Sequence, residues 1–290
     1  MKIAKVVRSN RNKSFKGSVI FYFLGYLLFL SNSLVASAQE DFFTGVLNGD
    51  LSKVKIAITE NADINAGIEK KIEKIKHKSG EYFEGSTALH IASGEGNIEL
   101  VTFLIENGIE INKKNSVGIT AFMTALYHKE EDIAKFLLGK GAKLFDKSDH
   151  SLDNNEKYYT TLMAASEGGC LQIVKLLIKN KVNVNEKTFY NYTALWLASK
   201  KGHLEIVKIL LDNKADIHIK NSYGETAFMI SLSYGHEDIA KLLLKNGANI
   251  NDKNDIGWTP LMAASQGGCF KMVKLLIKRN ADINAIGYNG

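Results

Sequence analysis

The stretch Thr193–Leu211, TALWLASKKGHLEIVKILL, contains the parts of a complete helix–turn–helix unit. Threonine is a favoured N-cap residue, because its hydroxyl accepts a hydrogen bond from a free backbone N–H of the first helical turn. Gly202 can adopt the left-handed backbone conformation that ends a helix tightly. The apolar residues of Ile206–Leu211 then predict a second helix that carries the core. The stretch therefore predicts a short helix, a glycine stop and a second, more apolar helix.

The same pattern recurs at a nearly constant interval along the chain. The threonines that open each copy are separated by 33, 40, 33, 33 and 33 residues, and the 40 is one period plus a seven-residue insertion. These threonines are Thr87, Thr120, Thr160, Thr193, Thr226 and Thr259. A glycine ends the first helix in most copies, at Gly96, Gly169, Gly202, Gly235 and Gly268. Each helix pair is apolar on one side only, so the copies must stack on one another to bury that side.

This chain resembles an ankyrin-repeat array, whose motif is Thr-Pro-Leu-His-x-Ala. The motif appears as TALHIA in Thr87–Ala92 and as TPLMAA in Thr259–Ala264. A degenerate further copy precedes them within Gly49–Asn65, which brings the array to about seven repeats over residues 39–290. The resemblance implies an all-α solenoid of stacked helix-turn-helix units, with β-hairpin-like loops between them.

The chain departs from the family motif at its histidine, which survives only at His90. In the family this histidine ties neighbouring loops together by hydrogen bonds, so its loss elsewhere affects the rigidity of the loops and not the fold. The residues in its place are Met123, Met163, Trp196, Met229 and Met262.

A longer repeat is superimposed on the short one. Met163–Cys170 (MAASEGGC) recurs 99 residues later as Met262–Cys269 (MAASQGGC), and Thr120–Met123 (TAFM) recurs as Thr226–Met229. We interpret this as the duplication of a block of three repeats. Because a duplication copies residues whether or not they have a function, the repeated Gly-Gly-Cys is weak evidence for a site.

The first 38 residues have the three parts of a secretory signal peptide. Met1–Lys16 is basic, Val19–Leu30 is an unbroken apolar run of twelve residues, and the segment then turns small and polar up to Ala38. A membrane-spanning helix needs about 20 apolar residues, so the run is short for a span. We therefore predict a signal peptide over residues 1–38, with cleavage after Ala38. The alternative is an uncleaved membrane anchor, since Leu34 and Val35 extend the apolar stretch.

The positive charge of the chain belongs to this leader. The formal net charge is +6, and the leader alone holds six basic side chains and no acidic one, so residues 39–290 carry no net charge. This argues against binding to nucleic acid or to a membrane surface. We expect a protein that is periplasmic or secreted, or anchored in the membrane if the leader is retained. The frequent use of Lys, Asn and Ile fits a bacterial source.

Nothing in the sequence indicates catalysis, a metal or a cofactor. The seven histidines lack metal-ligand spacing, and no phosphate-binding or nucleophile motif is present. Cys170 and Cys269 occupy equivalent positions three repeats apart, roughly 25–30 Å at the usual spacing of stacked helices, which is too far for a disulfide. We expect buried structural thiols, with pairing between chains or a redox role as alternatives. We expect no catalytic residue, metal, cofactor or small-molecule substrate.

A row of lysines follows the second helices and could bind anions. Acidic residues lie three positions before the lysine position on several of these helices, a spacing that favours ion pairs on one helix face. The lysines are Lys55, Lys135, Lys175, Lys208, Lys241 and Lys274, and the acids are Glu99, Asp132, Glu205 and Asp238. A solvated outer face explains the row better than a ligand site.

Aromatic residues in the loops before each threonine give the best indication of binding. In ankyrin arrays these loops form a row of fingers that borders a concave face. Tyr and Trp often dominate protein interfaces, so we predict that the loop aromatics anchor a partner protein. The alternative is that several of them pack on the adjacent finger. The predicted binding residues are Tyr82, Phe83, Tyr158, Tyr159, Tyr190, Tyr192, Tyr223 and Trp258, with Phe189 beside them.

Two insertions lengthen the fingers, near residues 67–84 and 146–158. Variation in such loops changes specificity without disturbing the stack, and the isoleucine spacing around Glu69–Lys78 is typical of a short helix. The last repeat resembles the internal copy at Thr160–Asn185 rather than a polar cap. This raises the hypothesis of self-association at the C-terminal end.

We therefore predict an exported scaffold that binds another protein through its concave face and fingers, and not an enzyme. A preformed surface of this kind lowers the ordering cost of association. The alternatives are a secreted effector that binds a host protein and a periplasmic protector or regulator of an enzyme.

Overall fold

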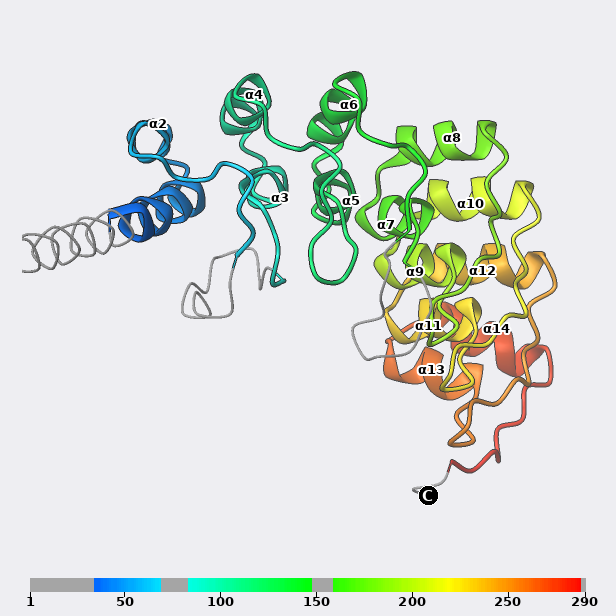
Figure 1. Ribbon diagram of the computed structural model, residues 1–290. Coiled ribbons are helices and arrows are strands. Elements are labelled where there is room, and N and C mark those ends of the chain that lie inside the picture. Colours follow the sequence, from blue (N-terminus) through cyan, green and yellow to red (C-terminus); the bar gives the residue numbers. More distant parts are fainter. Residues whose placement is uncertain (1–33, 69–82, 148–158, 288–290) are drawn as a thin grey trace, which may run out of the picture. The chain divides into compact units, whose positions relative to one another are not determined.

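The computed structural model describes residues 34–68, 83–147 and 159–287 (Figure 1). Most of the predicted signal peptide, the predicted short helix at Glu69–Lys78, and the predicted binding residues Tyr82 and Tyr158 lie outside these ranges. The chain forms two compact units, one ending at Ile64 and the other beginning at Asn65. Each is described below by itself.

The first unit contains the degenerate repeat. Residues 34–48 are helical, and helix α2 (Leu51–Thr59) follows after a turn. Asp50 caps α2, because its side chain accepts a hydrogen bond from the backbone N–H of Lys53 at 3.0 Å. Phe42 and Phe43 are buried and pack edge to face, with ring centroids 5.4 Å apart. The predicted cleavage point after Ala38 falls within the helical residues, and signal cleavage stays a prediction.

The second unit consists of six helix pairs, one for each threonine of the period (Figure 1). The pairs are α3 (Ala88–Gly94) with α4 (Ile98–Glu106), α5 (Ala121–Tyr127) with α6 (Glu131–Gly139), α7 (Thr161–Gly168) with α8 (Leu171–Lys179), α9 (Ala194–Lys201) with α10 (Leu204–Asp212), α11 (Ala227–Ser233) with α12 (Glu237–Lys245), and α13 (Pro260–Gln266) with α14 (Phe270–Lys278).

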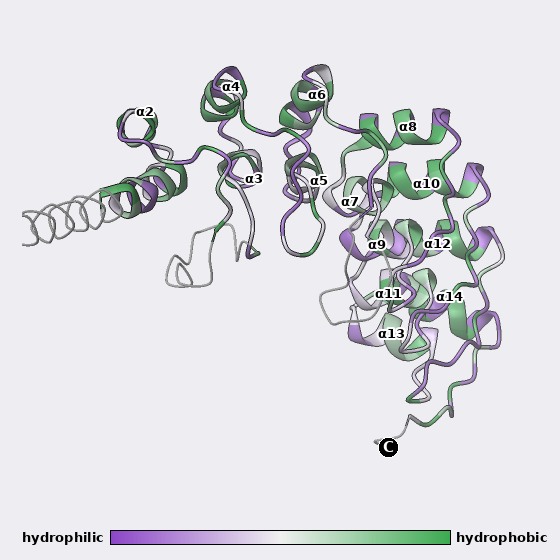
Figure 2. Cartoon of the chain, in the orientation of Figure 1, coloured by the Kyte–Doolittle hydropathy of each residue, from purple (hydrophilic) through white to green (hydrophobic). Residues whose placement is uncertain are grey.

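The core runs along the stack of first helices. Each first helix packs on the next, from α3 through α5, α7, α9 and α11 to α13, and each also packs on its own second helix. A first helix therefore has neighbours on several sides, and all six residues Ala194–Ser199 of α9 are buried. The second helices keep one outer side in solvent, and hydrophilic residues gather in the connecting loops (Figure 2). The all-α solenoid predicted from the period is confirmed.

The helix boundaries follow the local chemistry of the sequence. All six threonines of the period are N-caps, and the hydroxyl of Thr193 accepts from the backbone N–H of Trp196 at 3.1 Å. Gly169 and Gly202 end their helices with φ of 83° and 82°. In the copy without this glycine, Lys129 takes the left-handed conformation instead, with φ of 70°, which costs more for a residue with a side chain.

The loops before the threonines are short hairpin-like fingers. The described part of the chain contains isolated antiparallel bridges at Gly67–Thr87, Lys114–Thr120 and Lys147–Thr160 and no longer strand. Backbone hydrogen bonds join neighbouring fingers: the N–H of Ser222 donates to the carbonyl of Tyr190 at 2.9 Å. The fingers are therefore held in fixed positions relative to one another.

The Gly-Gly-Cys motif is a packing contact between repeats. A Cβ on Gly168 would lie only 1.7 Å from the carbonyl oxygen of Leu126, so α7 approaches the preceding repeat as closely as a backbone can. The Cys170 thiol donates to the same oxygen at 3.4 Å, and burial raises its pKa to about 12. The duplicated copy repeats this arrangement at Gly267, with Cys269 on the Leu232 carbonyl. Both thiols are buried and free, which confirms the expected structural cysteines.

Histidines also connect the repeats. His90 accepts the N–H of Thr87 at Nδ1 (3.1 Å), and its Nε2 hydrogen-bonds the carbonyl of Ile119 in the next finger at 2.8 Å. This is the loop contact that the family resemblance implies. His203 and His236 make a different contact, from the start of a second helix to a carbonyl of the preceding repeat. At the equivalent position, the Cys170 thiol also hydrogen-bonds a carbonyl of the preceding repeat. A thiol and an imidazole therefore make the same kind of contact between repeats there.

Candidate binding surface

The predicted binding residues do not all lie together. Phe83 is exposed and Trp258 is half-buried, and neither makes a ring contact with another aromatic residue that the structure describes. The Tyr159 hydroxyl donates to Glu167 at 2.5 Å. Burial first, and then the charge of Glu167, raises the pKa of Tyr159 well above its usual value. Tyr159 is therefore committed to an internal contact.

The remaining finger aromatics pack with Trp196 of α9 in one group, here called the aromatic cluster: Phe189, Tyr190, Tyr192, Trp196 and Tyr223. The rings of Tyr190 and Tyr223 come from neighbouring fingers and are nearly parallel, with centroids 6.4 Å apart and 10° between their planes. Phe189 packs edge to face on Tyr190 at 4.9 Å, and Tyr192 lies 4.3 Å from Trp196 at the base.

The backbone of the first finger fixes the cluster. The N–H of Thr188 donates to the carbonyl of Tyr192, while the Thr188 hydroxyl accepts the N–H of Tyr192, both at 3.0 Å. Asn191 has a positive φ of 57°, a conformation that asparagine tolerates better than most residues. This tight turn places Tyr190 at the tip of the finger.

The second finger is fixed by an asparagine. The side-chain oxygen of Asn221 accepts the N–H of Tyr223 at 3.0 Å and of Glu225 at 2.8 Å. Tyr223 is nevertheless 55% exposed, so its ring packs on Tyr190 and still offers a face to solvent. Both interpretations of the finger aromatics thus apply to this pair, which packs across the fingers and remains accessible.

Three residues of this surface lie outside the finger loops: Trp196, Lys200 and Tyr234. Trp196 is 5% exposed and forms the base of the cluster from inside α9. The Lys200 ammonium lies 5.4 Å from the centroid of the Trp196 ring and 5.6 Å from that of Tyr234, at the far end of the cation–π range. Tyr234 follows α11 and is 54% exposed. The sequence signal for Trp196 was present, because tryptophan there replaces the motif histidine beside three finger aromatics.

The charges around the cluster are unevenly paired. Burial raises the pKa of Tyr192 above its usual value, with smaller contributions from Tyr223, Glu225 and Tyr190. Glu225 accepts a hydrogen bond from the Asn221 side chain at 2.9 Å, and Lys201 pairs with Glu167 at 3.3 Å. Lys200 forms no ion pair with any residue in the described ranges.

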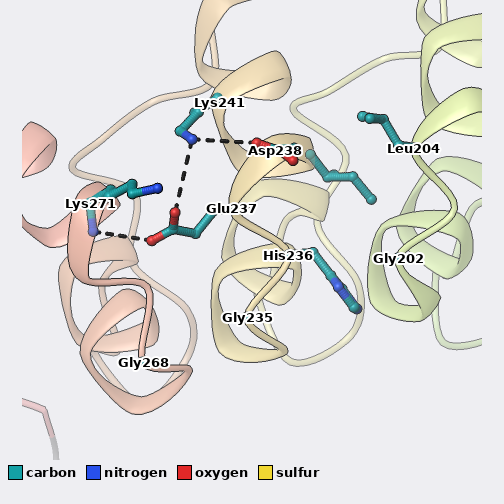
Figure 3. A pocket seen from close by; sticks show the side chains of 10 residues that line it. Gly202, Leu204, Gly235, His236, Glu237, Asp238, Lys241, Gly268 and Lys271 are labelled. Atoms are coloured by element: carbon teal, nitrogen blue, oxygen red, sulfur yellow. Dashed lines mark hydrogen bonds and ion pairs between the residues drawn. The ribbon is translucent and has the colours of Figure 1, made fainter.

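A hollow of the surface lies elsewhere, at the turns between first and second helices (Figure 3). Its volume is about 500 Å³, and Lys241 in its lining forms ion pairs with Glu237 and Asp238. Lys241 contacts Asp238 at 3.4 Å and Glu237 at 3.9 Å, and Glu237 accepts the backbone N–H of Lys271 at 3.1 Å. The His236 Nε2 donates to the Lys200 carbonyl at 3.0 Å. These contacts build the solenoid, and we assign no ligand to the hollow.

The lysine row on the second helices is a solvated outer face, as predicted. Lys135 pairs with Glu131 at 3.1 Å, Lys208 with Glu205 at 2.6 Å, and Lys241 with Asp238. Lys274 lies over the Phe270 ring instead, 4.5 Å from its centroid.

The described residues offer neither a metal site nor a membrane-spanning helix. They contain no group of three or more His, Cys, Asp or Glu side chains arranged to hold a metal ion. Among the same residues, no helix has the length and apolar character that crossing a membrane requires.

Comparison with known proteins agrees with the fold. The family model "Ankyrin repeats (3 copies)" matches residues 42–148, 143–221 and 213–286, which together span most of the chain. The stacked helix pairs, threonine caps and hydrogen-bonded fingers define a repeat scaffold. The chain belongs to the ankyrin-repeat family.

Similar curated proteins match parts of this chain. The rat (Rattus norvegicus) ankyrin repeat and SAM domain-containing protein 6 is 43% identical over 60 residues, which are 20% of this chain and 7% of that protein. The Caenorhabditis elegans ankyrin repeat and KH domain-containing protein mask-1 is 31% identical over 139 residues, 41% of this chain and 5% of that protein. A probable E3 ubiquitin-protein ligase of rice (Oryza sativa subsp. japonica), XBOS32, is 27% identical over 154 residues, 52% of this chain and 28% of that protein.

The match therefore spans a small part of each relative. Ankyrin repeats indicate a protein-interaction scaffold, and this statement holds for the present chain. The matched region of XBOS32 is 28% of that protein, so its name carries no activity over to this one.

Proposed function

We propose that this protein is an exported, non-enzymatic scaffold that binds another protein on its concave, finger-bearing face, with the aromatic cluster as the anchor. The observation that carries the proposal is the pair Tyr190 and Tyr223, which two neighbouring fingers hold nearly parallel while Tyr223 stays 55% exposed. Tyrosine and tryptophan are enriched among the residues that dominate the energy of protein interfaces.

Rigidity supports the same proposal. The two fingers are joined by the bond from Ser222 N–H to the Tyr190 carbonyl, and each has its own internal hydrogen bonds. A surface that is ordered before binding loses little conformational entropy when a partner docks. Tyrosine lowers this entropy loss further, because only two side-chain torsions must be fixed to provide a large contact area.

Export is the second part of the proposal and rests on residues 1–38, with their basic, apolar and small-residue segments. A cleaved leader would deliver the scaffold to the periplasm or the exterior, and a retained one would anchor it in the membrane. In the periplasm the partner would be a resident protein, such as an enzyme that the scaffold protects or regulates. Outside the cell it would be a host protein that a secreted effector binds.

The test is affinity capture with the tagged full-length protein, using native envelope and culture fluid as separate sources of partner. The variant Tyr190→Ala/Tyr223→Ala removes the exposed pair, and Phe270→Ala is the matched control because it removes an aromatic ring that is 66% exposed on an outer helix. Far-UV circular dichroism establishes that all variants are equally folded.

We expect mass spectrometry to identify one protein that the wild type and the Phe270→Ala control retain and the double variant loses. Equal recovery by all three proteins would contradict the role of the cluster. The source that yields the partner would separate the envelope and extracellular alternatives.

A further inference from the structure

We propose that the partner inserts an acidic side chain, flanked by apolar residues, into the aromatic cluster, where its carboxylate pairs with Lys200. This inference rests on the proposed function and specifies the chemistry of the partner at that site. It follows from the polar groups that the cluster leaves unmatched.

The first of these groups is the ammonium of Lys200. Neighbouring lysines on the same helix pair are neutralised within the chain: Lys201 by Glu167 at 3.3 Å and Lys208 by Glu205 at 2.6 Å. Lys200 instead lies over the rings of Trp196 and Tyr234, with no carboxylate partner in the described part of the chain. Ring faces attract a cation weakly compared with a carboxylate, so Lys200 retains most of its capacity to form an ion pair.

Nearby acids are engaged elsewhere. Glu225, on the second finger, accepts from Asn221 Nδ2 at 2.9 Å. Glu186, which precedes the first finger, pairs with Lys147 at 2.8 Å. Glu167 faces Lys201 and the Tyr159 hydroxyl. No carboxylate in the described ranges forms an ion pair with Lys200, so the complementary negative charge is left for the partner to supply.

The second unmatched group is the indole N–H of Trp196. This tryptophan is 5% exposed, and its Nε1 has no hydrogen-bond partner among the described residues. A buried donor without an acceptor is unfavourable, and few occur in folded proteins. Both unmatched groups of the cluster are donors. A carboxylate is acceptor-only and negatively charged, so it complements the Lys200 ammonium better than an amide or a hydroxyl does, whereas the Trp196 Nε1 is itself buried.

The surroundings specify the residues beside the acid. Tyr234 presents ring surface beside Lys200, and the cluster continues from Trp196 through Tyr192 to Tyr190 and Tyr223. Tyr223 and Tyr234 are more than half exposed. Apolar or aromatic partner residues on these rings would exclude water, and an ion pair strengthens as the effective dielectric constant falls. The cluster therefore fits a short motif with one Asp or Glu between apolar side chains.

The experiment selects peptides from a random 12-residue phage-display library on the immobilised full-length protein. Affinities of the enriched synthetic peptides are then measured by fluorescence anisotropy against the wild type, Lys200→Met, Lys208→Met and Tyr190→Ala/Tyr223→Ala. Methionine keeps most of the lysine stem and removes only the charge, and Lys208 is a matched exposed lysine on the outer helix α10. A thermal melt of each variant confirms that the fold is intact.

We expect enriched peptides to share an acidic residue next to apolar ones, and Lys200→Met to weaken them at least tenfold while Lys208→Met changes Kd less than twofold. Replacing the peptide's acid by its amide should cause a similar loss, with no further loss when combined with Lys200→Met. Peptides that need the two tyrosines but contain no acid, or ignore Lys200→Met, would overturn the inference and leave the proposed function standing. No enrichment, or binding that ignores the tyrosines, would overturn both.

Discussion

Replacing Gly168 by alanine should separate two repeats that the structure holds in backbone contact. Gly168 ends α7, and an added Cβ would lie 1.7 Å from the carbonyl oxygen of Leu126 and 2.8 Å from its carbon. Carbon–oxygen contacts in proteins are ordinarily about 3.3–3.6 Å, so the two repeats would have to move apart by roughly 1.6 Å or more. Neither obstacle is a side chain that can rotate away.

The expected cost follows from two opposing effects. Overpacking a well-packed interface costs about 1–3 kcal/mol, and we take about 3 kcal/mol because the contact is with backbone. Alanine is better than glycine in a helix by up to about 1 kcal/mol. The free energy of unfolding should therefore fall by about 2 kcal/mol. Gly267 makes the same contact with Leu232, at 1.9 Å, and the same loss is expected there.

The assay is urea unfolding followed by far-UV circular dichroism, with Gly139→Ala as the matched control. Gly139 is also a helical glycine, at the end of α6, but it is exposed and has no neighbouring atom within 4 Å of the added Cβ. The control should be unchanged or slightly more stable. Reaction of Cys170 with a thiol reagent gives a local measure, since opening this contact exposes a thiol that is now 1% exposed. Equal stability of Gly168→Ala and Gly139→Ala would refute the close contact.

Three further predictions concern pH, export and assembly. Burial lowers the pKa of His90 from 6.5 to about 4. The unfolded chain therefore binds the proton more tightly than the folded chain does. The free energy of unfolding should fall by up to about 3 kcal/mol as pH falls from 6.5 to 4. His90→Met should remove this part of the pH dependence in urea unfolding, and an unchanged slope would contradict it. N-terminal sequencing of the exported protein should begin at Gln39, whereas an intact N-terminus would show that the leader is retained. On the last repeat, Phe270 is 66% exposed, and self-association through this end should raise the mass measured by light scattering with concentration; a monomer at high micromolar concentration rules it out.

The fold could be predicted from the sequence because its information is local and repeated. Each threonine both caps a helix and marks the period, and all six caps are where the spacing places them. The meaning of Gly-Gly-Cys could not be predicted, since it depends on the distance from Gly168 to a carbonyl 42 residues earlier in the chain. From the sequence the motif indicates only a by-product of duplication, and the structure adds that the copied residues form a contact.

The candidate site was only partly accessible to sequence analysis. Loop position pointed to Tyr190, Tyr192 and Tyr223 as neighbours in the chain's fingers. It also predicted Tyr159 as a binding residue, although the Tyr159 hydroxyl donates to Glu167 within the chain. Lys200 belongs to a helix, and its role depends on two rings that precede and follow it by four and 34 residues. Such contacts arise from the stacking of repeats, so they cannot be predicted from a single copy of the motif.

The internal duplication separates packing positions from positions of the cluster. Aligning the repeat of Thr87 with that of Thr193 gives TALHIASG against TALWLASK, so the two copies agree at the cap and at the core alanines and differ at the residues that build the site. In the first block Trp196, Lys200 and Tyr234 correspond to His90, Gly94 and His128. His90 uses its ring to bind the next finger at 2.8 Å. Trp196 makes no such hydrogen bond and supports surface aromatics instead. The two copies thus differ at this position: the first makes a loop contact, and the second supports an aromatic and cationic surface, as expected if that surface binds a partner.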